Sequence, residues 1–150
     1  MALDISGLLN EIVSHAMASG HFERVNAHEP ENPPGYGLTC AIWSNRITAI
    51  RSSGLDSITA RVEVTVRIMS PMFDPPDAID PTVIAAVDDL CAAYSGDFTL
   101  GGLVRHVDLL GAHGTPLDVR AGYLQQDGMK YRVMDITLPL IVNDLWTEAP

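Results

Sequence analysis

Cysteine and lysine are scarce in this chain of 150 residues, which has two cysteines, Cys40 and Cys91, and a single lysine. Two thiols cannot form a disulfide framework, and we expect both to be reduced residues of the core. The sequence also lacks a run of about 18 apolar residues, so it predicts no membrane-spanning helix. Its first residues lack the basic and apolar regions of a secretory signal, and we expect the chain to begin in the cytosol.

Positive charge is low as well, because 9 basic residues stand against 19 acidic ones and give a net charge of −10. No Lys or Arg occurs between Ile68 and Val104, a stretch that holds Asp74, Asp77, Asp80, Asp88, Asp89 and Asp97. Tight binding to nucleic acid requires a basic face, because phosphate contacts dominate that affinity. The charge alone therefore indicates a soluble acidic protein that repels DNA.

Motifs of catalysis and metal binding are missing. The sequence contains no HxH, HExxH or CxxC spacing, no GxSxG, and neither of the glycine-rich phosphate-binding motifs. His21 and His28 flank a possible strand, but a zinc site requires three or four converging ligands. His106 and Asp108 lie close together without a nucleophile that we can assign to them. We therefore expect no enzyme, no catalytic residues, no metal and no cofactor.

The clearest pattern is a strand from Ile58 to Ile68, in which apolar residues fill every second position. Successive side chains of a strand point to opposite faces, so one face is apolar and the other is polar and charged. Arg61, Glu63 and Arg67 lie on the polar face. Two interpretations stay open for it: a solvated surface, or a contact between subunits in which alternating charges fix the register. Trp146 is a further candidate for an interface, because tryptophan is enriched at binding hot spots.

The other elements follow from periodicity and turn residues. A helical stripe from Ile5 to Met17, with Asp4 as cap and Gly20 at the end, predicts a first helix. A second helix is expected to open at Asp80-Pro81 and to close at Ser95-Gly96. Further strands are expected at Phe22–His28, Leu38–Ile50 (with a bulge near Ser44), Leu103–Leu110, Leu117–Gln125 and Lys130–Val142.

Together these elements predict one domain over residues 1–150, of the α+β class. We expect a mostly antiparallel sheet with a long hairpin and two helices packed on one face. An Asp-Gly pair at residues 127–128 predicts the turn of a second hairpin. Pro139 predicts that the last strand lies at an edge or frays there.

This arrangement of an N-terminal helix, a long hairpin, a Pro/Asp break, a second helix and a three-stranded end resembles the tail terminator proteins of long-tailed bacteriophages. The resemblance extends over about residues 3–146, and residues 58–69 (ITARVEVTVRIM) and 129–140 (MKYRVMDITLPL) carry it best. It implies a structural virion protein that forms a ring, a homohexamer in that family. Such a ring caps the tail tube, ends its polymerisation and joins the tail to the head.

The resemblance further implies the partners: other copies of this chain, the tail tube protein and a neck or head-completion protein. DNA would pass through the ring without specific binding, and no membrane is involved. The location implied is the virion, at the interface of tail and head, and the host cytoplasm during assembly. A repulsive lumen suits DNA passage, so we expect Asp74, Asp77, Asp88 and Asp89 to face a channel.

Two alternatives remain. The first is another head–tail connector or neck ring protein of the same virion. The second, of a different class, is a small cytosolic metal- or histidine-dependent enzyme that uses His106 or the pair His21 and His28.

Overall fold

A computed structural model describes residues 5–20, 22, 24–26, 38–52, 57–71, 76–96, 100, 106–112, 114–126 and 128–147. Within these ranges there are two helices, α1 (Ile5–Ala18) and α2 (Pro76–Gly96). The strands are β1 (Arg24–Asn26), β2 (Thr39–Ser52), β3 (Ser57–Pro71), β4 (His106–Val107), β5 (Asp118–Gln126) and β6 (Met129–Thr147). The α+β class predicted from the sequence is confirmed.

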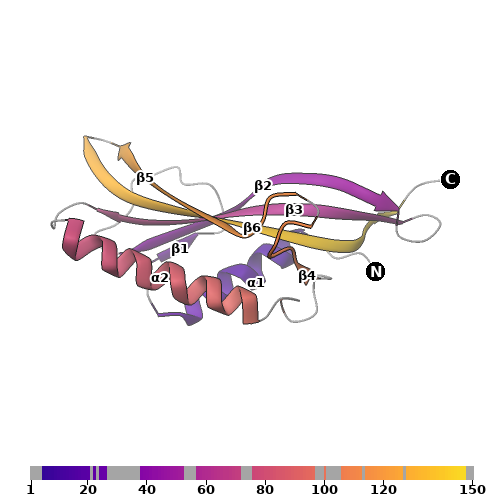
Figure 1. The fold of residues 1–150 in the computed structure, drawn as a ribbon, viewed down its shortest axis with the longest axis horizontal. Coiled ribbons are helices and arrows are strands. Elements are labelled where there is room, and N and C mark those ends of the chain that lie inside the picture. The colour runs from indigo at the N-terminus through magenta and orange to yellow at the C-terminus, as the bar shows by residue number, and fades with distance from the viewer. Residues whose placement is uncertain are drawn as a thin grey trace.

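The strands form one six-stranded sheet in the order β1-β2-β3-β6-β4, and β5 also pairs with β6. The short β1 runs parallel to β2, and every other pair is antiparallel. Both helices lie on the same face of the sheet (Figure 1). Strands of 14, 15 and 19 residues in β2, β3 and β6 make the sheet long.

The main core lies between this face and the helices. It contains the apolar residues of β3 at every second position, which confirms the alternation predicted for residues 58–68. From α1 it takes Leu8, Ile12 and Ala16, whereas Met17 at the end of the predicted stripe is 65% exposed. The two helices contact each other through Tyr94, whose hydroxyl donates to the Ile12 carbonyl at 3.2 Å.

The predicted bulge in the first hairpin is confirmed. The register of β2 against β3 shifts between Ser44 and Arg46, and it shifts again between Ala49 and Arg51. An extra residue in one strand moves the following side chains to the other face. The shift therefore explains why Cys40 and Ile47, of opposite parity, both pair with core positions of β3.

Three details of the sequence prediction are wrong. Helix α2 opens at Pro76 instead of Pro81, so Pro81 lies inside the helix. In the strand predicted at Leu103–Leu110, the described residues form a strand at His106–Val107, whereas Leu109 and Leu110 form a turn; residues 103–105 lie outside the described part of the chain. Pro139 is not at an edge, because β6 pairs with β3 there. On the side of β6 away from β3, Pro139 lies between the segment that pairs with β5 and the segment that pairs with β4. The N–H that proline lacks is therefore not needed for a strand–strand hydrogen bond there.

The opposite face of the sheet has no helix over it in the described part of the chain (Figure 1). A second apolar cluster lies on this open face, made of Ala41, Met69, Tyr131 and Val133 with Trp43 and Leu124 at its margin. No helix among the described residues is both long enough and apolar enough to cross a membrane.

Candidate interaction surface

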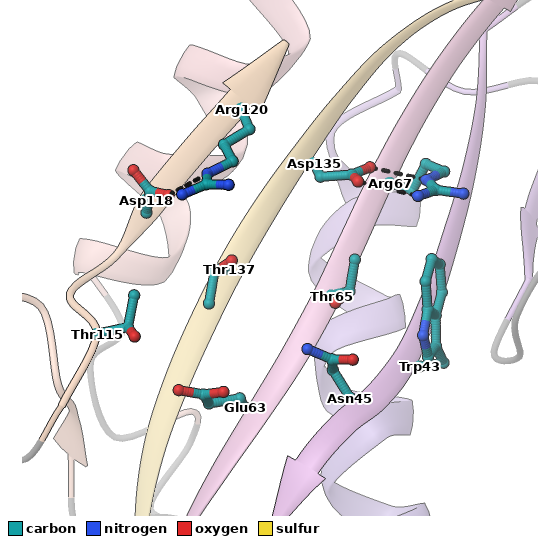
Figure 2. A pocket seen from close by; sticks show the side chains of 10 residues that line it. All are labelled: Trp43, Asn45, Glu63, Thr65, Arg67, Thr115, Asp118, Arg120, Asp135 and Thr137. Atoms are coloured by element: carbon teal, nitrogen blue, oxygen red, sulfur yellow. Dashed lines mark hydrogen bonds and ion pairs between the residues drawn. The ribbon is translucent and has the colours of Figure 1, made fainter. Parts of the chain in front are cut away.

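The open face carries a groove of about 390 Å³ that crosses four strands. Figure 2 shows its ten lining residues: Trp43, Asn45, Glu63, Thr65, Arg67, Thr115, Asp118, Arg120, Asp135 and Thr137. The strand registers explain why these charged residues lie side by side, because Arg67 lies opposite Asp135 and Asp135 lies opposite Arg120. The lining is polar, and its charges have both signs.

Arg67 is held in one orientation at the top of this groove. Its guanidinium donates two hydrogen bonds to the Asp135 carboxylate, at 2.8 and 3.0 Å. Its Cζ also lies 5.2 Å from the centroid of the Trp43 ring, a cation–π distance. A bidentate pair of this kind fixes geometry as well as charge. Arg67 and Asp135 are about one quarter to one third exposed, so the pair remains accessible to a partner.

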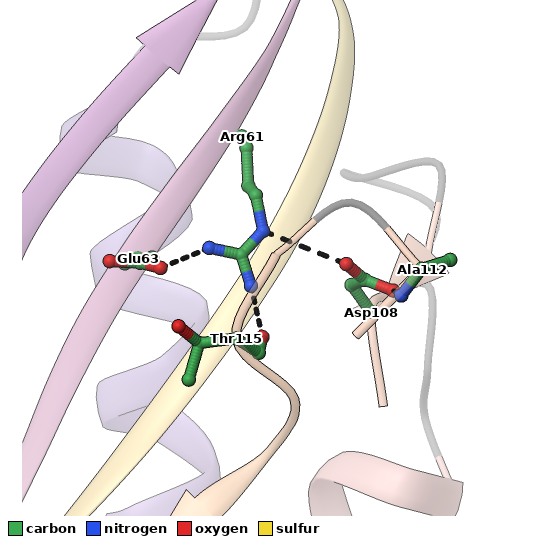
Figure 3. Close-up of polar contacts among 5 residues, drawn as sticks. All are labelled: Arg61, Glu63, Asp108, Ala112 and Thr115. Carbon is green, nitrogen blue, oxygen red and sulfur yellow. Dashed lines mark hydrogen bonds and ion pairs between the residues drawn. The ribbon is translucent and has the colours of Figure 1, made fainter. Parts of the chain in front are cut away.

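The polar face of β3 is not solvated at Arg61 and Glu63, because only 5% and 8% of their surfaces are exposed. Figure 3 shows the Arg61 guanidinium among three partners. It donates to the Glu63 carboxylate and to the Thr115 carbonyl, and its Nε lies 3.6 Å from the Asp108 carboxylate. Thr59, at the end of the same row, is also buried and donates to Asn143.

The loop from Asp108 to Leu117 provides this cover. The buried Asp108 carboxylate accepts a hydrogen bond from the Ala112 N–H at 2.8 Å. A Cβ atom at Gly114 would lie 2.9 Å from the Arg61 Cζ, so the loop backbone packs directly on the guanidinium. Gly111 has a φ of +74°, and a Cβ there would lie 2.6 Å from the Gly114 carbonyl oxygen. Gly111 and Gly114 therefore allow the backbone to lie close over Arg61.

Of the other predicted site residues, the side chains of two are described, and both lie away from this surface. Asp88 and Asp89 are exposed on α2, on the opposite side of the sheet. Asp74 lies outside the described residues, as do His21 and His28, and the side chain of Asp77 is likewise not described. Trp146 lies in β6, where its backbone pairs with Ile58, and its side chain is outside the described set.

Three partners of the arginines were missed from the sequence: Asp108, Thr115 and Asp135. For Asp135 a signal existed, because it shares the polar parity of β6 and antiparallel pairing brings such positions opposite the polar residues of β3. For Asp108 and Thr115 no local signal exists, since a loop more than 40 residues along the chain delivers them.

The groove offers charged and hydrogen-bonding groups to a partner. No group of three or more metal-ligating side chains exists among the described residues. Burial raises the pKa of the Cys40 thiol to about 12, and burial also raises the pKa of Cys91, with a smaller contribution from Asp88. Both thiols are therefore protonated at neutral pH. His106 is half-buried, and Asp108, two residues further along the chain, is turned to Arg61.

No protein-family model matches this chain, and no curated protein matches its sequence. Among solved structures, one chain of the virion of a native gene transfer agent particle is similar, with 14% identity and a TM-score of 0.47. The match covers 93% of this chain and 94% of that one. A sheath/tube terminator of an extracellular contractile injection system, PVC, is similar with 11% identity and a TM-score of 0.41. There the match covers 100% of this chain and 61% of that one.

Proposed function

We propose that this chain is a structural virion protein of a long-tailed phage or a related particle. In this role it forms a homo-oligomeric ring, a hexamer, that caps the tail tube, ends tube polymerisation and joins the tail to the head. The observation that carries the proposal is the order of elements in the described part of the chain, helix, long hairpin, helix and three terminal strands, which resembles the arrangement of tail terminators. A long sheet with one open, charged face supports a role in assembly.

The partners proposed are the tail tube protein on one side and a neck or head-completion protein on the other. DNA passes through the ring without specific binding. The net charge of −10 supports this, because an acidic protein repels the phosphates of DNA. Asp88 and Asp89 are exposed on α2, so they are available to face the channel. The proposed location is the virion, and the host cytoplasm during assembly.

The proposed subunit contact includes the groove on the open face. Arg67 is accessible there and held by Asp135 and Trp43, so it can contact a neighbour with little loss of side-chain entropy. Arg61 and Glu63 contribute differently, since both are buried and act by holding the loop at residues 108–117. Trp146 remains a proposed contact at the end of β6.

The decisive experiment compares particles assembled with and without this chain. If the chain is a terminator, its absence gives tubes of irregular length without attached heads. Electron cryo-microscopy of complete particles should then place a ring of this chain at the head-proximal end of the tube. Tails of normal length in its absence would refute termination, and a ring found at the portal without tube contact would identify a neck protein instead.

A further inference from the structure

Leu110 is the most exposed large apolar side chain in the described part of the chain, with 95% of its surface accessible. It lies in the turn at Leu109 and Leu110, at the start of the loop that covers Arg61. Single exposed apolar residues are common on protein surfaces. What distinguishes Leu110 is the number of buried groups that fix the loop carrying it.

Hydrogen bonds close this loop on both sides of Leu110. The Asp108 N–H donates to the Pro139 carbonyl at 2.8 Å, which ties the loop to β6. The Leu117 N–H donates to the Leu109 carbonyl at 3.1 Å, and Arg61 holds the Thr115 carbonyl. Burying an arginine and two carboxylates costs desolvation energy, which their mutual contacts must offset. A side chain presented on such a fixed loop loses little entropy on binding.

A depression of about 150 Å³ lies elsewhere on the same chain, on the β5–β6 hairpin. Its lining is Arg67, Arg120, Ala121, Gly122, Tyr123, Leu124, Val133 and Asp135. Nothing lies within 4 Å of the position where a Cβ of Gly122 would be, so the missing side chain keeps this space open. The depression is open to solvent, its lining is of mixed polarity, and a leucine side chain is smaller than its volume.

The Leu110 turn cannot reach the depression of its own chain. The strand leading to the turn pairs Val107 with Leu140, whereas Gly122 pairs with Val133. Seven residues of extended β6 separate these two points, a distance of about 23 Å. Leu110 is only three residues beyond Val107, and its turn is tied back to β6.

We propose that Leu110 of one copy inserts into the depression beside Gly122 of the next copy. Val133 and Leu124 would provide apolar contacts for the leucine, and Arg67 and Arg120 would lie at the rim. The two contact points differ, so the interface is head-to-tail, the type that closes into a ring when the rotation permits. The inference rests on the ring of the proposed function and names the residues that join its subunits.

Light scattering on the full chain tests this contact. Wild type, Leu110→Asp, Gly122→Val and the control Ile84→Asp are measured over a range of concentrations. Ile84 is a suitable control because it is an exposed apolar residue on α2, far from both contact points in sequence and 51% accessible. We expect a ring for wild type and Ile84→Asp. We expect at least a tenfold rise in the concentration needed for assembly for the other two, with unchanged circular dichroism.

A double variant separates direct contact from indirect effects. Leu110→Ala and Gly122→Val each weaken assembly, the first by loss of contact and the second by filling the depression. If the two side chains meet, the smaller residue fits the filled site, and the double variant assembles better than the two single effects predict.

Each outcome is distinct. Additive effects, or normal assembly of Leu110→Asp, would overturn the inference while the ring itself stands. A wild-type chain that stays monomeric at every concentration, alone and with tail tubes, would overturn the inference and the proposed ring together.

Discussion

Arg61 shows how a residue on the polar face of a strand becomes part of a buried network. Alternation in the sequence states which face a side chain points to, but not what covers that face. The cover here comes from residues 108–117, more than 40 positions later, and Gly114 fits only because it has no side chain. The charged row was therefore predictable, and its burial was not.

Replacing Arg61 by Met should destabilise the fold strongly. The change leaves Glu63 and Asp108 as buried carboxylates without their cation, a loss of about 3–5 kcal/mol. Arg67→Met is the matched control: its pair with Asp135 is partly exposed, and its loss should cost about 1 kcal/mol. Urea unfolding followed by circular dichroism measures both, and equal costs for the two variants would contradict the burial of Arg61.

Cys40 should make the fold sensitive to alkali. Its pKa is raised from 9.0 to about 12 in the folded state, so the unfolded chain loses its proton first as the pH rises. The stabilisation is complete below pH 9 and is lost progressively between pH 9 and about 12. We expect the melting temperature of wild type to fall more steeply over this range than that of Cys40→Ala. If the two melting temperatures fall in parallel with rising pH, the raised pKa of Cys40 does not cause the sensitivity to alkali.

At the scale of elements, the sequence predicts most of the fold because local signals and tertiary structure agree. The second hairpin pairs Gln126 with Met129, and Gly128 of the predicted turn has a φ of +77°. The bulge near Ser44 shows as a break in alternation. The start of α2 was predicted wrongly because two prolines offer the same signal for the first helical residue. Pro76 and Pro81 each follow an acidic, proline-rich stretch, and the helix begins at Pro76.

Pro81→Ala tests whether the inner proline weakens α2. Proline inside a helix removes one hydrogen bond and costs up to about 3 kcal/mol relative to alanine. Pro81 is exposed, so an alanine there fits without repacking the core. The variant should unfold at a higher urea concentration with an unchanged slope. Pro116→Ala, in a loop, serves as the comparison: it makes the unfolded chain more flexible and restores no helix hydrogen bond, so its urea midpoint should fall slightly. A midpoint that also falls for Pro81→Ala would contradict the cost assigned to the proline inside α2.

For the whole molecule, the two faces of the sheet carry different kinds of residues. The helices cover one face and form the main core, and the other face presents the groove, the Arg67–Asp135 pair and the depression beside Gly122. The acidic residues Asp88 and Asp89 lie on the helix side. In a ring, contacts through the open face and the hairpin would leave the helix side free to face the lumen or the exterior.

Asp88→Lys with Asp89→Lys distinguishes lumen from exterior. The pair of changes replaces two negative charges by two positive ones and so raises the net charge of −10 by four. If α2 lines the channel, the lysines attract the phosphates of passing DNA, so particles with normal tails should release DNA more slowly, and more so at low salt. Asn10→Lys with Ser14→Lys introduces two lysines on the exposed side of α1, on the same face of the sheet, and shows whether slower release belongs to α2 or to the whole helix side. Release at the wild-type rate from the Asp88/Asp89 variant would place α2 outside the channel, and the acidic charge would then serve solubility alone.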